Sequence, residues 1–101
     1  QGRTVEVRGM IVYISGKISG NPEYKKQFAA AAARLRQQGL EVINPAVLPQ
    51  MEYHKYPPIN LAMIDAADGL LLLPGWETST GAAWEAAYAR RMGKTIFEEQ
   101  S

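Results

Sequence analysis

The sequence predicts one α/β domain built on a parallel sheet, a Rossmann-like (flavodoxin-like) three-layer sandwich. Short apolar runs, typical of buried strands, alternate with longer amphipathic segments, typical of helices. The order is strand, helix, strand, helix, strand, helix, strand, which gives parallel strands with right-handed crossovers. A chain of 101 residues, of which 47% are hydrophobic, suits one core and leaves no room for a second domain.

The strands are expected where short apolar runs stop at a loop. The first run, residues 10–15, is rich in β-branched residues and stops at Gly16. Residues 69–73 form a continuous apolar run, which is typical of a strand covered on both faces. Residues 40–43 and 94–98 complete the predicted sheet.

The helices are expected between these strands. The first begins with Asn21 as its N-cap and a proline at the first helical position, and it ends at Gly39. The second is short and spans residues 59–67. The third runs from about residue 82 to residue 92 and is stopped by Gly93.

Composition narrows the function classes. The net charge is +1, and because a nucleic-acid-binding domain would be more basic, no nucleic-acid partner is expected. The lack of cysteine excludes disulfides and fits a reducing compartment. No apolar run approaches the roughly 20 residues of a membrane span, and no secretion signal is present, so we expect a cytoplasmic location and no membrane partner. With one histidine and no carboxylate at metal-ligand spacing, neither a metal nor a cofactor is expected.

Residues 1–9 receive no functional weight. Residues 4–8 alternate like an edge strand, but Met10 opens a strong strand and is a candidate for the natural start. We therefore expect residues 1–9 to be a leader or an added extension, and residues 10–101 to form the domain.

The first candidate binding segment is the glycine loop, residues 16–20. Ligands of parallel α/β sheets bind beyond the carboxyl ends of the strands, so the loops after Ser15, Ile43 and Leu73 should converge on one crevice. Glycines and a following helix N-terminus favour an anion such as phosphate. The loop lacks the P-loop pattern, and it fits an ordinary strand-to-helix turn equally well.

Glu85 is the candidate catalytic group. Its helical neighbours are apolar, whereas Arg90, Arg91 and Lys94 lie on the opposite side of the helix, so the carboxylate should face the sheet. A capping box does not explain it, because Ala82 stands where Ser or Thr is needed. Buried carboxylates are costly and have shifted pKa values. A functional role for Glu85 is therefore favoured. The alternative is a purely structural glutamate near the start of the helix, stabilised by the helix dipole.

Two further loops contain candidate ligand contacts. Residues 76–81 carry hydroxyls and glycine just before a helix, which favours either a second anion cradle or a helix cap with a solvated loop. Tyr53 and Tyr56 are placed to stack on a base. His54, alone among tyrosines, is more typical of a surface residue than of a ligand or base.

Together these segments resemble the nucleoside 2-deoxyribosyltransferase superfamily, in particular the small phage and bacterial proteins of the DUF4406 group. The resemblance covers residues 10–98. The matching segments are residues 13–20, 43–45, 67–69, 73–77 and 79–85.

This resemblance implies roles for the matching residues. In the family, the glutamate that matches Glu85 attacks the anomeric carbon of the sugar to give a glycosyl-enzyme, and the tyrosine that matches Tyr13 orients it. A desolvated carboxylate suits such an oxocarbenium-like centre. Substrate contacts are then expected from Gly16, Lys17, Ile18, Ser19, Gly20, Asn60, Trp76, Ser79 and Gly81.

Two positions refine the implied substrate. Deoxyribosyltransferases usually carry Asp six residues before the glutamate, whereas the related 2′-deoxynucleoside 5′-phosphate N-hydrolases carry Ser. Ser79, together with Lys17, therefore resembles the nucleotide hydrolases. Asn60 stands where the family commonly has an Asp that assists at the leaving base, and an asparagine can hydrogen-bond a base but cannot supply a proton.

The leading hypothesis is hydrolysis of a (deoxy)nucleoside 5′-monophosphate to base and sugar phosphate. The expected ligand is a small-molecule nucleotide. Because proteins of the family usually form dimers, the resemblance also implies a homodimer. Base exchange between deoxynucleosides is one alternative, against which Ser79 argues. A nucleotide sensor without turnover is the other, and Asn60 supports it.

Overall fold

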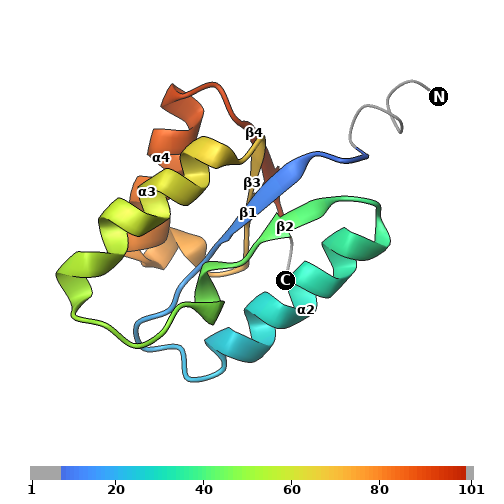
Figure 1. The fold of residues 1–101 in the computed structure, drawn as a ribbon. Coiled ribbons are helices and arrows are strands. Elements are labelled where there is room, and N and C mark those ends of the chain that lie inside the picture. The colour runs from blue at the N-terminus through green and yellow to red at the C-terminus, as the bar shows by residue number, and fades with distance from the viewer. Residues whose placement is uncertain (1–7, 100–101) are drawn as a thin grey trace.

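Four parallel strands form one sheet within residues 8–99, the part of the chain that the computed structural model describes. They are β1 (Ile11–Ser15), β2 (Glu41–Ile43), β3 (Gly69–Leu72) and β4 (Thr95–Glu98), and their order across the sheet is β2-β1-β3-β4 (Figure 1). Each strand matches its predicted range to within one residue. The strand order reverses direction between β1 and β3, which makes this the switch point at which α/β sheets bind ligands.

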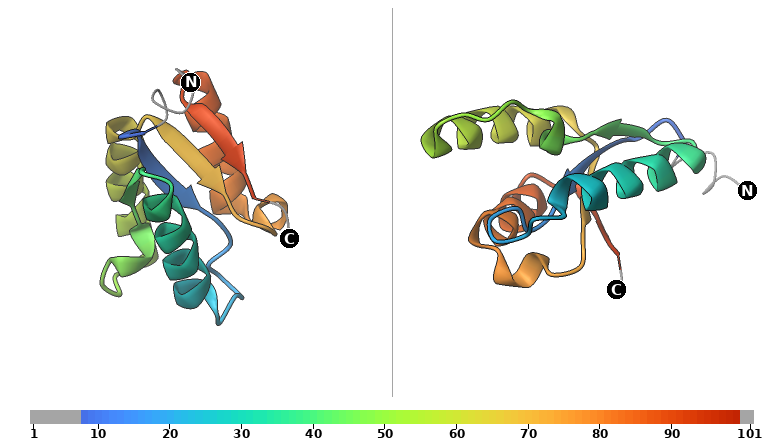
Figure 2. Two further views of the ribbon diagram at one scale, coloured as in Figure 1. Left: turned by 90° about the vertical axis from the view of Figure 1, so that its right-hand side faces the viewer. Right: turned by 90° about the horizontal axis from the view of Figure 1, so that it is seen from below.

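Three α-helices connect the strands: α2 (Tyr24–Gln37), α3 (Tyr56–Ala66) and α4 (Thr80–Arg91). Helix α2 covers one face of the sheet, and α3 and α4 cover the other (Figure 2). The predicted three-layer sandwich is thereby confirmed. Short 3-10 helices in the loops after β2 and β3 span Pro45–Val47, Tyr53–Lys55 and Trp76–Thr78.

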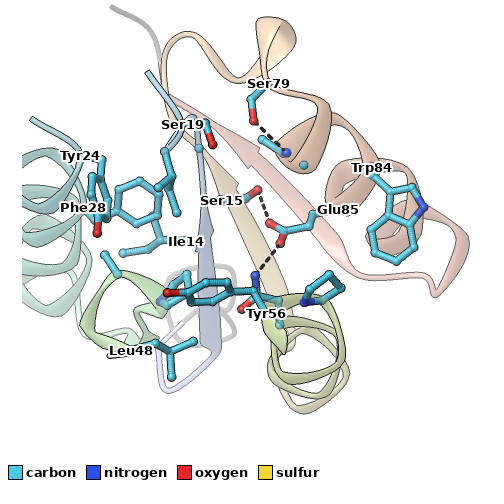
Figure 3. Close-up of a pocket in the computed structure, with 18 of the residues that line it drawn as sticks. Ile14, Ser15, Ser19, Tyr24, Phe28, Leu48, Tyr56, Ser79, Trp84 and Glu85 are labelled. Atoms are coloured by element: carbon cyan, nitrogen blue, oxygen red, sulfur yellow. Dashed lines mark hydrogen bonds between the residues drawn. The ribbon is translucent and has the colours of Figure 1, made fainter. Parts of the chain in front are cut away.

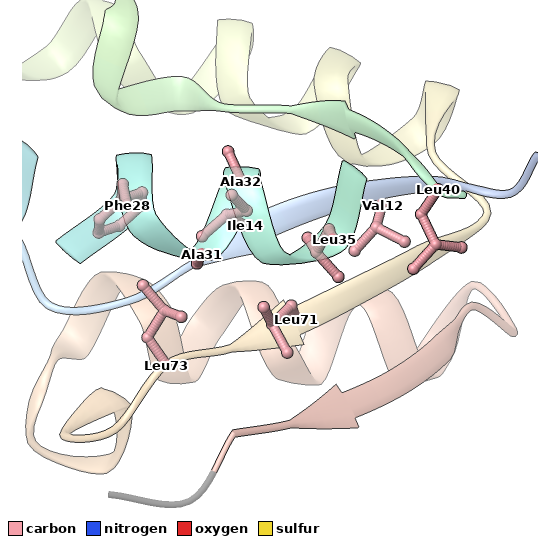
Figure 4. Packing of buried hydrophobic residues seen from close by; sticks show 9 residues of the cluster. All are labelled: Val12, Ile14, Phe28, Ala31, Ala32, Leu35, Leu40, Leu71 and Leu73. Atoms are coloured by element: carbon pink, nitrogen blue, oxygen red, sulfur yellow. The ribbon is translucent and has the colours of Figure 1, made fainter. Parts of the chain in front are cut away.

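Successive residues of β1 face two separate cores. Val12 and Ile14 face α2, where they pack with Phe28 and Leu35 (Figure 4). Tyr13 faces α3 and α4. Because side chains alternate along a strand, the residue two positions after Tyr13 shares its face. Strand β3 is buried along its whole length, as its continuous apolar run predicts.

Helix α2 begins later than the sequence predicts. Asn21 is not its N-cap, because Glu23 occupies that position. The backbone N–H of Tyr24 donates to the Asn21 carbonyl (3.1 Å), and the Asn21 side-chain amide donates to the Lys17 carbonyl (2.9 Å). The asparagine therefore closes the glycine loop instead of capping the helix.

The two helix ends predicted at glycines are confirmed. Gly39 (φ +86°) and Gly93 (φ +76°) take the left-handed conformation that ends a helix. Helix α3 begins three residues earlier than predicted, at Tyr56, because prolines are tolerated in a first turn, where no N–H partner is needed. Helix α4 begins two residues early, with Ser79 as its N-cap.

The expectations for residues 1–9 fall almost wholly outside the described part of the chain. Of these residues, Arg8 and Gly9 belong to a turn, in which the Gly9 N–H donates to the Gly39 carbonyl (2.9 Å). In residues 8–99, no helix combines the length and the apolar character needed to cross a bilayer.

Leu70→Ala should lower the free energy of unfolding by about 2–5 kcal/mol, because truncation leaves a cavity between the sheet and α4. Leu70 is fully buried on a central strand. Urea unfolding followed by circular dichroism measures the change. Val47 is 77% exposed, so Val47→Ala is the control and should change stability by no more than about 0.5 kcal/mol. Equal losses in the two variants would contradict the assignment of the core.

Candidate active site

A cavity of about 630 Å³ opens beyond the carboxyl ends of β1 and β3. The loops after β1, β2 and β3 all contribute to its wall, as the parallel order of the strands leads us to expect. Ser19 and Ser79 lie toward one end, Leu48 and Tyr56 lie toward the other, and Glu85 lies between them (Figure 3). The cavity therefore has a polar end and a more apolar end, with a carboxylate in the middle.

The Glu85 carboxylate accepts hydrogen bonds at both oxygens. The Ser15 hydroxyl donates to Oε1 (2.7 Å), and the Tyr13 hydroxyl donates to Oε2 (3.1 Å). The Asn60 side-chain amide also donates to Oε2, at 3.3 Å. Three donors from two elements thus fix the orientation of one partly buried carboxylate, and Figure 3 shows the Ser15 hydroxyl among them.

Regular periodicity brings these groups together. Tyr13 and Ser15 are two residues apart on β1, so both face α4. On α4, the residues that are fully or almost fully buried are Ala82, Ala86 and Ala89. Because these side chains are small, the helix lies close to the sheet and the Glu85 carboxylate reaches the strand.

Burial raises the pKa of Glu85 above its ordinary value of 4.5, and the hydrogen bonds from Ser15, Tyr13 and Asn60 only partly offset this effect. Burial also raises the pKa of Tyr13, and the adjacent Glu85 raises it further. Tyr13 therefore remains a protonated donor to the carboxylate. No lysine, arginine or histidine lies among the described residues that line the cavity.

The first turn of α4 forms part of the polar end. The Ser79 Oγ accepts a hydrogen bond from the Ala82 N–H (3.1 Å), which leaves its own hydroxyl hydrogen for a ligand. The N–H groups of Thr80 and Gly81 have no partner within residues 8–99. Neither backbone nor packing requires a glycine at position 81, since its φ is not positive and an added Cβ would meet no atom within 4 Å.

Aromatic side chains form much of the remaining wall. The rings of Tyr24 and Phe28 pack edge to face, with centroids 6.2 Å apart. The Tyr56 hydroxyl accepts from the Met51 N–H (2.9 Å) and donates to the Pro49 carbonyl (3.0 Å). Tyr56 thus holds the loop after β2 against the start of α3.

Eight of the predicted site residues line this cavity. They come from β1, from the loop that follows it, and from α3 and α4 with the N-cap of α4. They are Tyr13, Gly16, Ile18, Ser19, Asn60, Ser79, Gly81 and Glu85.

The other three predicted contacts, Lys17, Gly20 and Trp76, lie outside the cavity wall, which differs from the sequence-based expectation. Gly20 has a positive φ (+74°), which serves the turn before α2. The Trp76 indole N–H donates to the Glu98 carboxylate (3.0 Å), which holds the ring over β4. Gly20 and Trp76 therefore have local structural roles.

Ser15 is a site residue that the sequence analysis did not single out. It is 1% exposed and makes the shortest of the three hydrogen bonds to Glu85. The available signal was its polar side chain at the end of an apolar strand, two positions after Tyr13. No group of three possible metal-ligating side chains occurs in the described part of the chain.

A family model for a domain of unknown function, DUF4406, matches residues 10–98. The chain belongs to the DUF4406 family. The resemblance to the DUF4406 group found in the sequence is thereby confirmed. Among curated proteins, none matches the chain.

Solved structures with low sequence identity share the fold of this DUF4406 domain. A 2-desoxiribosyltransferase from Leishmania mexicana has a TM-score of 0.72 and 20% identity, over 88% of this chain and 63% of its own. A 2-deoxyribosyltransferase from Bacillus psychrosaccharolyticus has a TM-score of 0.69 and 24% identity, over 87% and 70%. A conserved protein from Enterococcus faecalis V583 has a TM-score of 0.65 and 15% identity, over 89% and 62%. The chain thus spans less than two thirds of the Leishmania and Enterococcus proteins.

Glu85→Gln should stabilise the domain increasingly as the pH rises through the folded-state pKa of Glu85. That pKa is raised, so the protonated carboxyl stabilises the folded state at low pH, and this contribution is lost when the group ionises. Glutamine never ionises. Thermal unfolding of both proteins from pH 4 to pH 8 measures the difference, with Glu77→Gln at an exposed position as the control. A difference independent of pH would contradict the desolvation of Glu85.

Proposed function

We propose that this DUF4406 protein cleaves the N-glycosidic bond of a nucleoside 5′-monophosphate, with Glu85 as the nucleophile. The observation that carries the proposal is a partly buried carboxylate, oriented by three donors, in the middle of a cavity with a polar and an apolar end. The names of two proteins that share the fold, both deoxyribosyltransferases, support chemistry at this class of bond.

The reaction proceeds in two displacements. A Glu85 oxygen attacks the anomeric carbon, and the bond to the base breaks with its electron pair moving to the base nitrogen. Water then attacks the same carbon, which releases the sugar phosphate and restores the carboxylate. The attacking water gives one proton to the solvent, and a base that left as an anion takes one up from it. Tyr13 and Ser15 hold the carboxylate toward the cavity, so little orientation remains to be fixed when the substrate binds.

The polar end suits the 5′-phosphate. Ser79 lies six positions before Glu85, which corresponds to about 9 Å along a helix axis. The free N–H groups of Thr80 and Gly81 and the Ser79 hydroxyl lie there, and Ser19 lines the same end. Phosphate binding in this proposal depends on these neutral donors.

A second candidate function is transfer of the sugar to another base. The names of the two deoxyribosyltransferases that share the fold favour it. Only the acceptor in the second displacement differs, a base nitrogen in place of water. Adding a free base to the reaction and looking for a new nucleoside distinguishes the two functions.

Glu85→Gln should reduce the release of free base by at least about 1,000-fold, because it removes the nucleophile and keeps the shape of the side chain. Chromatography of reactions with nucleoside monophosphates of purine, pyrimidine and pyridine bases measures the release. Glu77→Gln, at an exposed glutamate, should retain the wild-type rate. Release that persists in Glu85→Gln would show that the nucleophile is another group.

Gly81→Ala should weaken the binding of a nucleoside monophosphate by roughly tenfold and leave the binding of the parent nucleoside unchanged, because the new methyl group takes the space beside the phosphate donors. The same change should stabilise the domain by about 0.4–1 kcal/mol, since alanine favours the helix. Titration calorimetry and urea unfolding measure the two effects. Equal affinity of wild type and variant for the monophosphate would remove this end of the cavity as the phosphate site.

A further inference from the structure

The residues that line the cavity include no acid suited to protonate a departing base. Besides Glu85, which acts as the nucleophile in the proposed function, the titratable groups in the described wall are four tyrosines. Tyr13 donates to Glu85, and its pKa is raised. Tyr56 donates to the Pro49 carbonyl. Tyr24 packs edge to face on Phe28, and Tyr53 is 75% exposed to solvent.

The same wall contains no cation to stabilise a base that departs as an anion. His54 is exposed and approaches Glu52 (3.9 Å) outside the cavity, and Lys55 approaches the same carboxylate (3.6 Å). Lys17 also lies outside the wall. An anion released beside the Glu85 carboxylate, in a wall without a cation, would be poorly stabilised. A base can therefore leave readily only as a neutral molecule that takes up no proton.

Asn60 favours a base that donates a hydrogen bond. Its side-chain nitrogen donates to Glu85, and its side-chain oxygen is buried with no partner among the described residues. A buried acceptor without a donor is costly, so a ligand that supplies an N–H group there gains a hydrogen bond. Asn60 lies on α3 one turn after Tyr56, and Tyr56 lies at the end of the cavity away from Ser79 (Figure 3).

We propose, on the basis of the proposed function, that the base recognised here is a cationic heterocycle that carries an N–H donor, such as an N-alkylated purine or a pyridinium carboxamide. The Glu85 carboxylate gives the cavity a negative charge that complements such a base. Several aromatic rings stand in the wall, Tyr24, Phe28 and Tyr56 among them, and rings of this kind attract cations through their faces.

The chemistry of a cationic base balances without an acid. When Glu85 bonds to the anomeric carbon, the electron pair of the breaking bond neutralises the positive ring nitrogen, and the base leaves neutral. Water then displaces the carboxylate, and one of its protons goes to the solvent. The sum is cationic nucleotide plus water, giving neutral base, sugar phosphate and one proton.

Two matched substrate pairs test this inference on the intact protein. One pair is 7-methylguanosine 5′-monophosphate and guanosine 5′-monophosphate, and the other is nicotinamide mononucleotide and its reduced form. Within each pair the base changes from cationic to neutral with little change in shape. Base release is measured by chromatography, relative to the uncatalysed rate of each compound. The cationic member should be accelerated roughly 100-fold more, the size of a missing general acid, and the pair that shows the larger effect identifies the class of cation.

Asn60→Asp supplies the missing acid, because two adjacent carboxyl groups share a proton. The variant should accelerate the neutral substrates and narrow the ratio within each pair. The inference would be overturned if the wild type accelerated base release equally from the cationic and neutral members and Asn60→Asp left these rates unchanged. The proposed function would then remain intact. No release from any member by either protein would overturn both.

Discussion

The Glu85 carboxylate is held partly out of water, and the described residues that line its cavity include no cation. Ionised groups in such surroundings are costly, and hydrogen bonds are the compensation that this domain supplies. Two donors come from β1 and one comes from α3, so the sheet and two helices must be in place together before the carboxylate is satisfied. The small residues on the inner side of α4 follow from the same requirement, since a larger side chain would hold the helix away from the strand.

Most of the fold could be predicted because its signals are local. Strand β3 is buried along its whole length, so its continuous apolar run marks it to within one residue. Gly39 and Gly93 mark helix ends because few other residues take their conformation. The start of α2 was harder to predict. An asparagine before a proline fits an N-cap, yet Asn21 hydrogen-bonds the preceding loop, and tertiary geometry decides between these two local patterns.

The residues of the site also fall into those that local patterns predict and those that they do not. Helical phase turns Glu85 toward the sheet, and strand alternation applied to Tyr13 would also have found Ser15. Lys17 and Trp76 lie in a loop and in a 3-10 turn, where no regular period fixes the direction of a side chain, and proximity in sequence was a poor guide to the cavity wall. Patterns of this kind show where a side chain points. The chemistry expected of it came from the family resemblance.

The donors to the carboxylate and the rim of the cavity belong to different kinds of structure. Tyr13 and Ser15 lie on β1, which pairs with β3 in the middle of the sheet, whereas Ile18 and Tyr53 come from connections at its edge and are exposed. Central strands are the last parts of a domain to open, and connecting segments accept substitution and insertion. Over the course of descent, chains with this fold can therefore acquire new ligand preferences through the rim while the environment of the carboxylate stays the same.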